Sequence, residues 1–469
     1  MKQTIVLFRR DLRLSDHPAL TAAADRGAVI PVVLLDDAVT SLGGAAKMRL
    51  GLSLACFSAD LEKRGMRVIL RRGEAASLVH ELIRESGADA VYWSRRYDPD
   101  GVATDTALKA GLSEIGVEAR SYAGTLLFEP WTVETGAGGP FRVYSPFWKA
   151  VRGRVLPNVL PIPKLIAPDA WPASDALDDW HLSRDMQRGA EVVARHVSAG
   201  EAASVTRLDD FVVERIDAYK DARDFMDRDA TSGLSDALSV GEISPLQCWA
   251  AGQRAMEEGK RGAEHFLKEV VWREFAWHLM WHFPTLDREN WRAGWDRFEW
   301  IEDEAHPHYL AWCQGRTGVA LVDAAMRELY VTGKMHNRAR MITASYLTKH
   351  LRSHWRLGLK WFQDCLVDWD AASNAMGWQW VAGSGPDAAP FFRIFNPDRQ
   401  ADQFDARQIY RRRWLADRYG AQDDHTDQFH AATPKSWHET MQQPVLKPIV
   451  GLKQGRDAAL AAYGDVKSQ

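Results

Sequence analysis

Residues 29–36 read VIPVVLLD, a short and almost wholly apolar run that ends in an acid. Three runs of the same kind lie around it: TIVLF at 4–8, RVIL at 67–70 and AVYW at 90–93. Stretches with helical character, such as SLACFSADLEKRG at 53–65, separate them. Buried strands that alternate with helices are typical of a parallel sheet. We therefore predict an α/β domain with a Rossmann-like parallel sheet over residues 1–130.

The remainder of the chain has a different character. Residues 131–200 are rich in Pro and Gly, as in GAGGP at 136–140, and we expect a long interdomain linker on the surface. Helical periodicity dominates residues 201–469, and Gly333 alone interrupts it between 321 and 351. We predict an all-α domain there. A chain of 469 residues is too long for one ordinary core, which agrees with two domains.

Composition limits the classes of function. The formal net charge is −4, so a general nucleic-acid coat protein is not indicated, although a local basic groove is compatible with it. The four cysteines form no CxxC pair, and we expect no metal site. The chain shows no signal peptide and no apolar run of the roughly 18 residues that a membrane helix needs. The 20 tryptophans form either a large aromatic core or, in part, a stacking or redox system.

Polar residues of defined type recur in the helical half. The stretch DWDAASNAMGWQW at 368–380 spaces Asp370, Asn374 and Trp378 four residues apart, so a helix would place them on one face. A buried Arg340 must be paired, and Asp368 or Asp370 is the candidate partner. The alternative is a purely structural salt bridge between two helices.

Five segments in this order resemble the DNA photolyase/cryptochrome family. They are FRRDLRLSDHPAL at 8–20, TSGLS at 231–235, WREF at 272–275, MHNRARMITAS at 335–345 and NAMGWQWVAGSGPDAAPFFRIFNP at 374–397. The resemblance covers nearly the whole chain. It is greatest to bacterial cyclobutane pyrimidine dimer photolyases of the class III branch, near class I, on GGPFRVYSPFWKA at 138–150 and DAASNAMGWQWVAGSGPDAAP at 370–390.

The resemblance implies that the helical domain holds FAD. The positions expected at its phosphates are Tyr219, Thr231, Ser232, Gly233, Leu234 and Ser235. The rest of the pocket falls to Phe266, Arg273, Asn337, Arg340, Asp368, Asp370 and Asn374, with Asn374 facing flavin N5. An amide there can donate or accept a hydrogen bond.

The resemblance also implies an electron-transfer chain and a pocket for a flipped lesion. Trp378, Trp355 and Trp300 match the three indoles of the chain, with Trp312 as the alternative to Trp300. Glu269, Trp272, Trp380, Asn337 and Met341 match the lesion pocket. Enzymes for (6–4) photoproducts have His at the positions of Asn337 and Met341, so a cyclobutane dimer is the expected substrate. The positions expected to contact the phosphodiester backbone of DNA are Arg223, Arg338, Arg393 and Gln400.

Three departures from the family pattern bear on these expectations. Lys334 replaces a Trp, Trp369 replaces a small residue, and AAKMRLGLSL at 45–54 lacks aromatic residues that the branch often has near the antenna. A folate-type antenna is the expectation, with a deazaflavin or no antenna as alternatives.

We therefore expect a deoxyribodipyrimidine photo-lyase that splits the dimer with an electron from excited, reduced FAD. Its partner is UV-damaged DNA, and it works as a monomer in the bacterial cytoplasm, at the nucleoid, with no membrane contact. The first alternative is a cryptochrome photoreceptor with little repair, but Asn374, the lesion-pocket residues and the absence of a long tail after Phe404 argue against it. The second is an ordinary flavin oxidoreductase, for which no GxGxxG provides a nicotinamide site.

Overall fold

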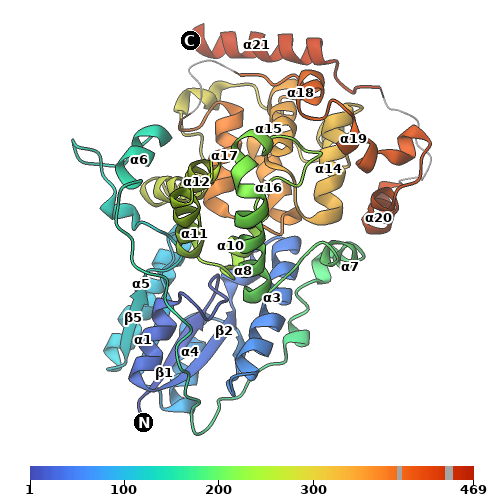
Figure 1. Cartoon of the computed structure of the whole chain (residues 1–469). Helices are drawn as coiled ribbons and strands as arrows, with labels where there is room; N and C mark the ends of the chain where they lie inside the picture. The colour runs from blue at the N-terminus through green and yellow to red at the C-terminus, as the bar shows by residue number, and fades with distance from the viewer. Residues whose placement is uncertain (388–392, 439–446, 469) are drawn as a thin grey trace.

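The computed structural model describes residues 1–387, 393–438 and 447–468, and it divides the chain into an α/β part and a helical part (Figure 1). Residues 388–392 of the motif at 374–397 lie outside the described residues. Among the described residues, no helix is both long and apolar enough to cross a membrane.

Five parallel strands form the sheet in the order β3-β2-β1-β4-β5. They are β1 (Gln3–Phe8), β2 (Ala28–Leu35), β3 (Ile69–Arg72), β4 (Ala90–Ser94) and β5 (Glu118–Tyr122). Every residue of β2 is buried, since successive side chains enter opposite cores. Val29 and Val33 pack with one core, and Ile30 and Val32 with the other. The predicted α/β domain is confirmed.

Helices cover both faces of this sheet. The first core includes α1 (Pro18–Arg26) and α3 (Gly44–Glu62), and the second includes α4 (Ala75–Ser86) and α5 (Pro99–Glu114). The short α2 (Asp37–Thr40) follows β2 directly. This arrangement leaves the carboxyl ends of the strands directed at the helical domain, where ligands of open α/β sheets bind.

The segment between the domains is more than a surface linker. Its α6 (Tyr144–Val151) buries Tyr144, Phe147, Trp148 and Val151, which lie on one side of the helix. The α7 helix (Gly189–Ala194) buries Val192 and Val193 in the same way. Apolar spacing therefore holds two parts of this Pro-rich segment against the domains.

The helical domain is built from fourteen α-helices among the described residues. They are α8 (Glu201–Asp210), α9 (Tyr219–Ala222), α10 (Ser235–Val240), α11 (Pro245–Glu257), α12 (Ala263–His282), α13 (Pro307–Cys313), α14 (Ala320–Thr332), α15 (Asn337–Ser345), α16 (Trp355–Cys365), α17 (Ala371–Ala382), α18 (Pro397–Phe404), α19 (Ile409–Trp414), α20 (Asp424–Ala432) and α21 (Leu452–Ser468). The break at Gly333 is confirmed, since this glycine ends α14 with φ 66°.

Buried polar contacts join the two domains. Arg49 of α3 pairs with Glu242 at 2.6 Å, and both side chains are fully buried. Arg10, just after β1, donates to the carbonyl oxygens of Ser239 at 2.5 Å and Trp369 at 2.7 Å. These bonds hold the carboxyl end of the sheet next to the segment that leads into α17.

Candidate functional site

The α17 helix begins at a carboxylate that several groups hold in place. Asp370 is its N-cap and accepts a hydrogen bond from the backbone N–H of Ser373 at 2.8 Å. Its other oxygen accepts from the indole N–H of Trp277 at 3.0 Å and lies 3.9 Å from Nε of Arg273. Burial opposes ionisation of Asp370, but the charges of Arg273 and Arg10 outweigh it and lower its pKa. A fixed anion therefore stands at the start of this helix.

The predicted helix with Asn374 and Trp378 on one face is confirmed as α17. Asn374 is buried and donates from Nδ2 to the backbone oxygen of Asp370 at 3.0 Å, which uses one of the amide's two donors. One turn later Trp378 is 3 % exposed and packs against Phe362, with ring centroids 4.9 Å apart. The amide and the indole therefore lie in succession on a rigid element.

Gly358 of α16 is required by Trp378. A Cβ atom at this glycine would lie 2.1 Å from Cη2 of the Trp378 ring. Carbon atoms in contact lie ~3.5–4.0 Å apart, so only glycine admits the indole here. The sequence analysis missed Gly358, although an isolated glycine within a helical pattern is a signal for close packing.

Of the two candidate partners of Arg340, Asp368 is the one with which it forms an ion pair. Its Nη2 lies 2.7 Å from Oδ2 of Asp368, and its Nε donates to the Met335 oxygen at 2.8 Å. Oδ1 of Asp368 is buried and has no hydrogen-bond partner within the described part of the chain. A bound group with a hydroxyl or N–H donor would satisfy this oxygen. The orphaned acceptor is the observation that best fits a polar ligand such as FAD.

The segment Thr231–Ser235 is fixed by a cluster of charges behind it. Arg207 donates to the oxygen of Gly233 at 2.8 Å and to Asp236 at 3.0 Å. Nζ of Lys334 lies 3.0 Å from the other oxygen of Asp236. Burial opposes ionisation of Asp236, but Lys334, Arg49 and Arg207 lower its pKa. Lys334 is thus paired with the carboxylate that directly follows the expected phosphate segment.

Tyr219 and Phe266 form a buried aromatic corner. Their ring centroids lie 6.1 Å apart in an edge-to-face arrangement. The guanidinium carbon of Arg223 lies 5.2 Å from the Tyr219 ring, and Arg223 is ion-paired with Glu269. One ion pair therefore links an expected phosphodiester contact to the carboxyl group expected at the lesion.

Aromatic residues line the expected lesion side. Trp272 is half-buried and stacks on Tyr144, with centroids 3.6 Å apart and planes at 7°. Tyr144 comes from α6, so the interdomain segment completes this wall. Trp380 donates from its indole N–H to the oxygen of Asp387 at 3.1 Å. Both indoles are thus held in fixed orientations.

Asn337 and Met341 are one turn apart on α15, exposed and half-buried respectively. The N-cap of this helix is His336, whose Nδ1 accepts from the backbone N–H of Arg338 at 3.1 Å. Burial lowers the pKa of His336 to about 4, which keeps this nitrogen an acceptor. A neutral histidine therefore sets the direction of the first turn.

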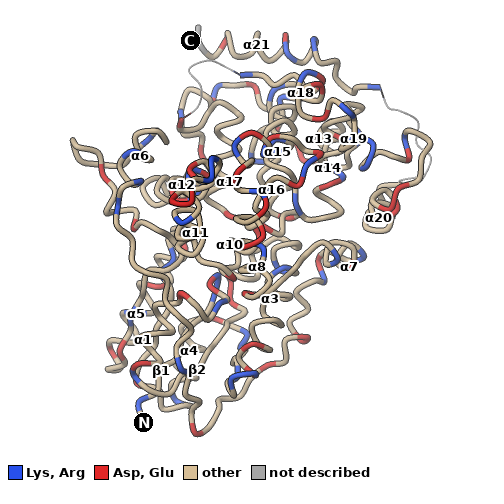
Figure 2. Tube along the Cα trace, in the orientation of Figure 1, with Lys and Arg blue, Asp and Glu red and all other residues tan. Residues whose placement is uncertain are grey.

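The expected backbone contacts to DNA differ in their surroundings. Arg338 is ion-paired with Asp224 and lies 4.6 Å from the Phe404 ring. Arg393 is exposed, and Gln400 is half-buried with an Oε1 that has no hydrogen-bond partner among the described residues. Figure 2 shows both signs of charge spread over both domains. The structure places these residues without testing their role.

The outer two of the expected electron-transfer indoles, Trp355 and Trp300, are joined through one packed ring, that of His354. Trp355 is fully buried and donates to Oδ1 of Asn290 at 2.8 Å. The ring of His354 lies 5.4 Å from Trp355 and 5.1 Å from Trp300, which is half-buried. Trp312 is 0 % exposed and lies 6.1 Å from Trp378, beside the first indole rather than at the surface. This burial favours Trp300 as the outer member.

A cavity of about 830 Å³ lies where the domains meet. Its lining includes Arg9, Asp36 and Asp98 from the α/β domain, and Arg273 and Trp369 from the helical domain. Trp369 thus borders the cavity at the domain boundary. The volume lies within the ~300–1,000 Å³ of ordinary small-molecule sites.

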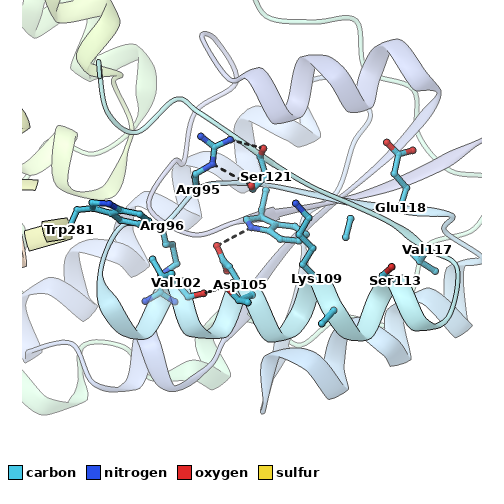
Figure 3. A pocket seen from close by; sticks show the side chains of 14 residues that line it. Arg95, Arg96, Val102, Asp105, Lys109, Ser113, Val117, Glu118, Ser121 and Trp281 are labelled. Carbon is cyan, nitrogen blue, oxygen red and sulfur yellow. Dashed lines mark hydrogen bonds between the residues drawn. The ribbon is translucent and has the colours of Figure 1, made fainter. Parts of the chain in front are cut away.

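A second cavity of about 650 Å³ lies beside α5 and β5 (Figure 3). Most of its charged side chains are already paired. Arg95 binds Glu129 at 2.6 Å, and Arg96 binds Asp98 at 2.6 Å. Asp105 accepts from the indole N–H of Trp93 at 2.9 Å. Because these charged groups are paired within the protein, we do not assign this cavity to the site.

The fold and this arrangement of residues define a flavoprotein of the photolyase type, and comparison with known proteins agrees. The family model for DNA photolyase matches residues 4–168, and the model for the FAD-binding domain of DNA photolyase matches residues 266–465. The chain belongs to the DNA photolyase family, so the expected resemblance is confirmed.

Individual relatives give the same result. The chain is 45 % identical to a deoxyribodipyrimidine photo-lyase of Agrobacterium fabrum, over 99 % of this chain and 98 % of the relative. It is 33 % identical to cryptochrome-2 of Arabidopsis thaliana, over 88 % of this chain and 70 % of that protein. A class III photolyase structure from Agrobacterium tumefaciens superposes with a TM-score of 0.90 at 44 % identity, covering 100 % of this chain and 98 % of that chain.

Proposed function

We propose that this protein is a deoxyribodipyrimidine photo-lyase that uses light to split cyclobutane pyrimidine dimers in DNA. The observation that carries the proposal is α17, which begins at the fixed Asp370 anion and continues through Asn374, Trp378 and Trp380. One rigid helix thereby joins the expected flavin site, the first indole and the lesion wall. The full-length similarity to the Agrobacterium photo-lyase supports it.

FAD fits the residues that surround this helix. Thr231–Ser235 would hold its phosphates, and the buried Oδ1 of Asp368 would accept a hydrogen bond from it. Arg273, paired with Asp370, and Arg340, paired with Asp368, would place positive charge beside the flavin. When bound, reduced and excited by light, FAD supplies the electron that opens the dimer. Because the carboxylates are already paired with arginines, the protein does not need to reorganise its charges during this step.

The lesion would bind between Trp272 and Trp380, with Glu269 donating to or accepting from the dimer. Glu269 is oriented by Arg223, so phosphodiester binding and lesion binding share one ion pair. Asn337 and Met341 provide neutral contacts and no proton donor of the histidine type. This chemistry suits a cyclobutane dimer, where only an electron has to move in and out.

Two further elements belong to the proposal. Trp378, Trp355 and Trp300 would restore reduced FAD, with the ring of His354 packed between the outer two indoles. The cavity at the domain boundary would hold an antenna chromophore, because it reaches both the strand ends and Trp369. The resemblance to the class III branch favours a folate-type antenna, and a deazaflavin or no antenna are the alternatives. We place the protein as a monomer on bacterial DNA.

Repair of an oligonucleotide with a single thymine dimer tests this function. The purified, FAD-loaded protein should remove the dimer under blue light and not in the dark. Glu269→Gln should weaken repair roughly ten- to a hundredfold, the worth of a hydrogen bond to a charged group. Glu264→Gln is the matched control, because Glu264 lies on the same helix and is paired with Lys268 at 2.9 Å. Loss of repair in both variants would contradict the role of Glu269.

The similarity to cryptochrome-2 keeps a photoreceptor as the second candidate. A parent protein that photoreduces its FAD but leaves the dimer intact would favour that candidate. Light-dependent repair in the parent protein would exclude it as the main activity.

A further inference from the structure

The packed aromatic rings do not end at Trp300. The Trp300 ring is stacked with Trp295, with centroids 6.1 Å apart and planes at 27°. The Trp295 ring is stacked in turn with Tyr463, at 5.6 Å and again 27°. Phe298 packs against both indoles, at 4.4 Å from Trp300 and 5.4 Å from Trp295. Two aromatic steps therefore lead from Trp300 to a tyrosine.

Three separate elements build this extension. Trp295 lies in a short 3₁₀ helix (Ala293–Arg297), and Tyr463 lies on α21, which runs across the outer side of the helical domain (Figure 1). Gly383, which ends α17, would place a Cβ atom 3.0 Å from the Trp295 ring. The helix that carries Trp378 thus abuts the extension at its other end.

We propose that Tyr463 is the final electron donor of the chain, reached from Trp300 through Trp295; this inference rests on the proposed role of Trp378, Trp355 and Trp300. An electron taken from Trp378 by light-excited FAD leaves an oxidised indole. Each oxidised indole then takes an electron from its outer neighbour, until Trp295 is the oxidised ring. Tyr463 then gives up one electron to Trp295, its O–H bond breaks, and the proton goes to water. The indole is restored and a neutral tyrosyl radical remains.

The properties of the two outer residues support this direction. Trp295 is buried, whereas Tyr463 is half-buried at the edge of the cluster and can release a proton to solvent. Loss of that proton separates the charge from the interior, because the electron can return only if a proton returns with it. A thiol or another external one-electron reductant would later restore Tyr463. Packing alone would be served equally well by phenylalanine.

Flash excitation of the full-length, FAD-loaded protein without an external reductant tests the proposal. In the parent, the narrow absorption and the electron paramagnetic resonance spectrum of a neutral tyrosyl radical should replace the indole signal, more slowly in deuterium oxide. Tyr463→Phe keeps the stacked ring but should abolish this radical, and the indole signal should then decay several-fold faster. Trp295→Phe should reduce the tyrosyl yield several-fold.

Tyr330→Phe is the control, because Tyr330 is also half-buried and stacked on an indole, Trp361, at 6.2 Å. A tyrosyl radical that persists in Tyr463→Phe, or that disappears in Tyr330→Phe instead, would overturn the proposal. So would a parent protein that forms an indole radical and no tyrosyl radical.

Failure of the proposed function would look different. Dimer repair by protein whose FAD has been reduced chemically does not need the chain, and Tyr463→Phe should leave it at the parent level. Absence of repair in the parent under those conditions would contradict the photo-lyase alone. A parent protein with no indole radical would contradict both the chain and its extension.

Discussion

Gly358→Ala tests the tightest contact in the site. The added methyl group would lie 2.1 Å from Cη2, 2.4 Å from Cζ3 and 2.7 Å from Cζ2 of Trp378. Ordinary carbon contacts are ~3.5–4.0 Å, so the indole or α16 must move by about 1.5 Å. The ring is rigid and has no flexible end that could turn away. The indole must therefore shift as a whole.

Two opposing contributions set the size of the effect. Overpacking of a core costs ~1–3 kcal/mol, and the rigid ring puts this site at the upper end of that range. Alanine gains ~1 kcal/mol over glycine within a helix. The net loss in the free energy of unfolding is therefore ~2 kcal/mol, which corresponds to a fall of roughly 4–8 °C in the melting temperature of a domain this size.

The control is Gly464→Ala on α21, where an added Cβ atom would meet nothing within 4 Å. This variant should gain up to ~1 kcal/mol from helix propensity alone. Melting temperature and the yield of FAD photoreduction should both fall in Gly358→Ala and not in Gly464→Ala. If Gly358→Ala melts at or above the parent temperature and photoreduces normally, the contact argument is refuted.

Three more predictions concern charges in and around the site. Arg340→Ala leaves the carboxylate of Asp368 buried and unpaired, which should lower the free energy of unfolding by ~3 kcal/mol. The double variant Arg340→Met with Asp368→Asn should recover part of this loss. An equal loss in the single and the double variant would contradict the pairing. Burial lowers the pKa of His354 to about 3 from the 6.5 of an unfolded histidine, so its contribution is complete above pH 6.5 and is lost as the pH falls toward 3. His354→Asn keeps a cap that does not titrate and should flatten the acid side of a melting-temperature profile, whereas an unchanged profile would exclude His354 as a cause. Lys334→Met should weaken FAD binding roughly five- to tenfold in low salt and less in high salt, measured by titration of the apoprotein, and a difference that does not respond to salt would exclude an electrostatic role.

The sequence by itself determined the class of each domain. Apolar runs such as VIPVVLLD can be buried on both faces only within a covered sheet, and the periodicity after residue 200 left only helices. The spacing of Asp370, Asn374 and Trp378 placed them on one helix, because a helical repeat is a local property of the chain. The break at Gly333 followed from local backbone preference in the same way.

Only the tertiary structure decided the contacts between distant segments. The sequence leaves both Asp368 and Asp370 as possible partners of Arg340. The structure pairs Arg340 with Asp368, because Asp370 is already bound to Ser373, Trp277 and the start of α17. The contact of Gly358 with Trp378 and that of Trp295 with Tyr463 join separate helices. Periodicity tells which face of a helix is buried, but which side chain meets it depends on how all the helices pack together.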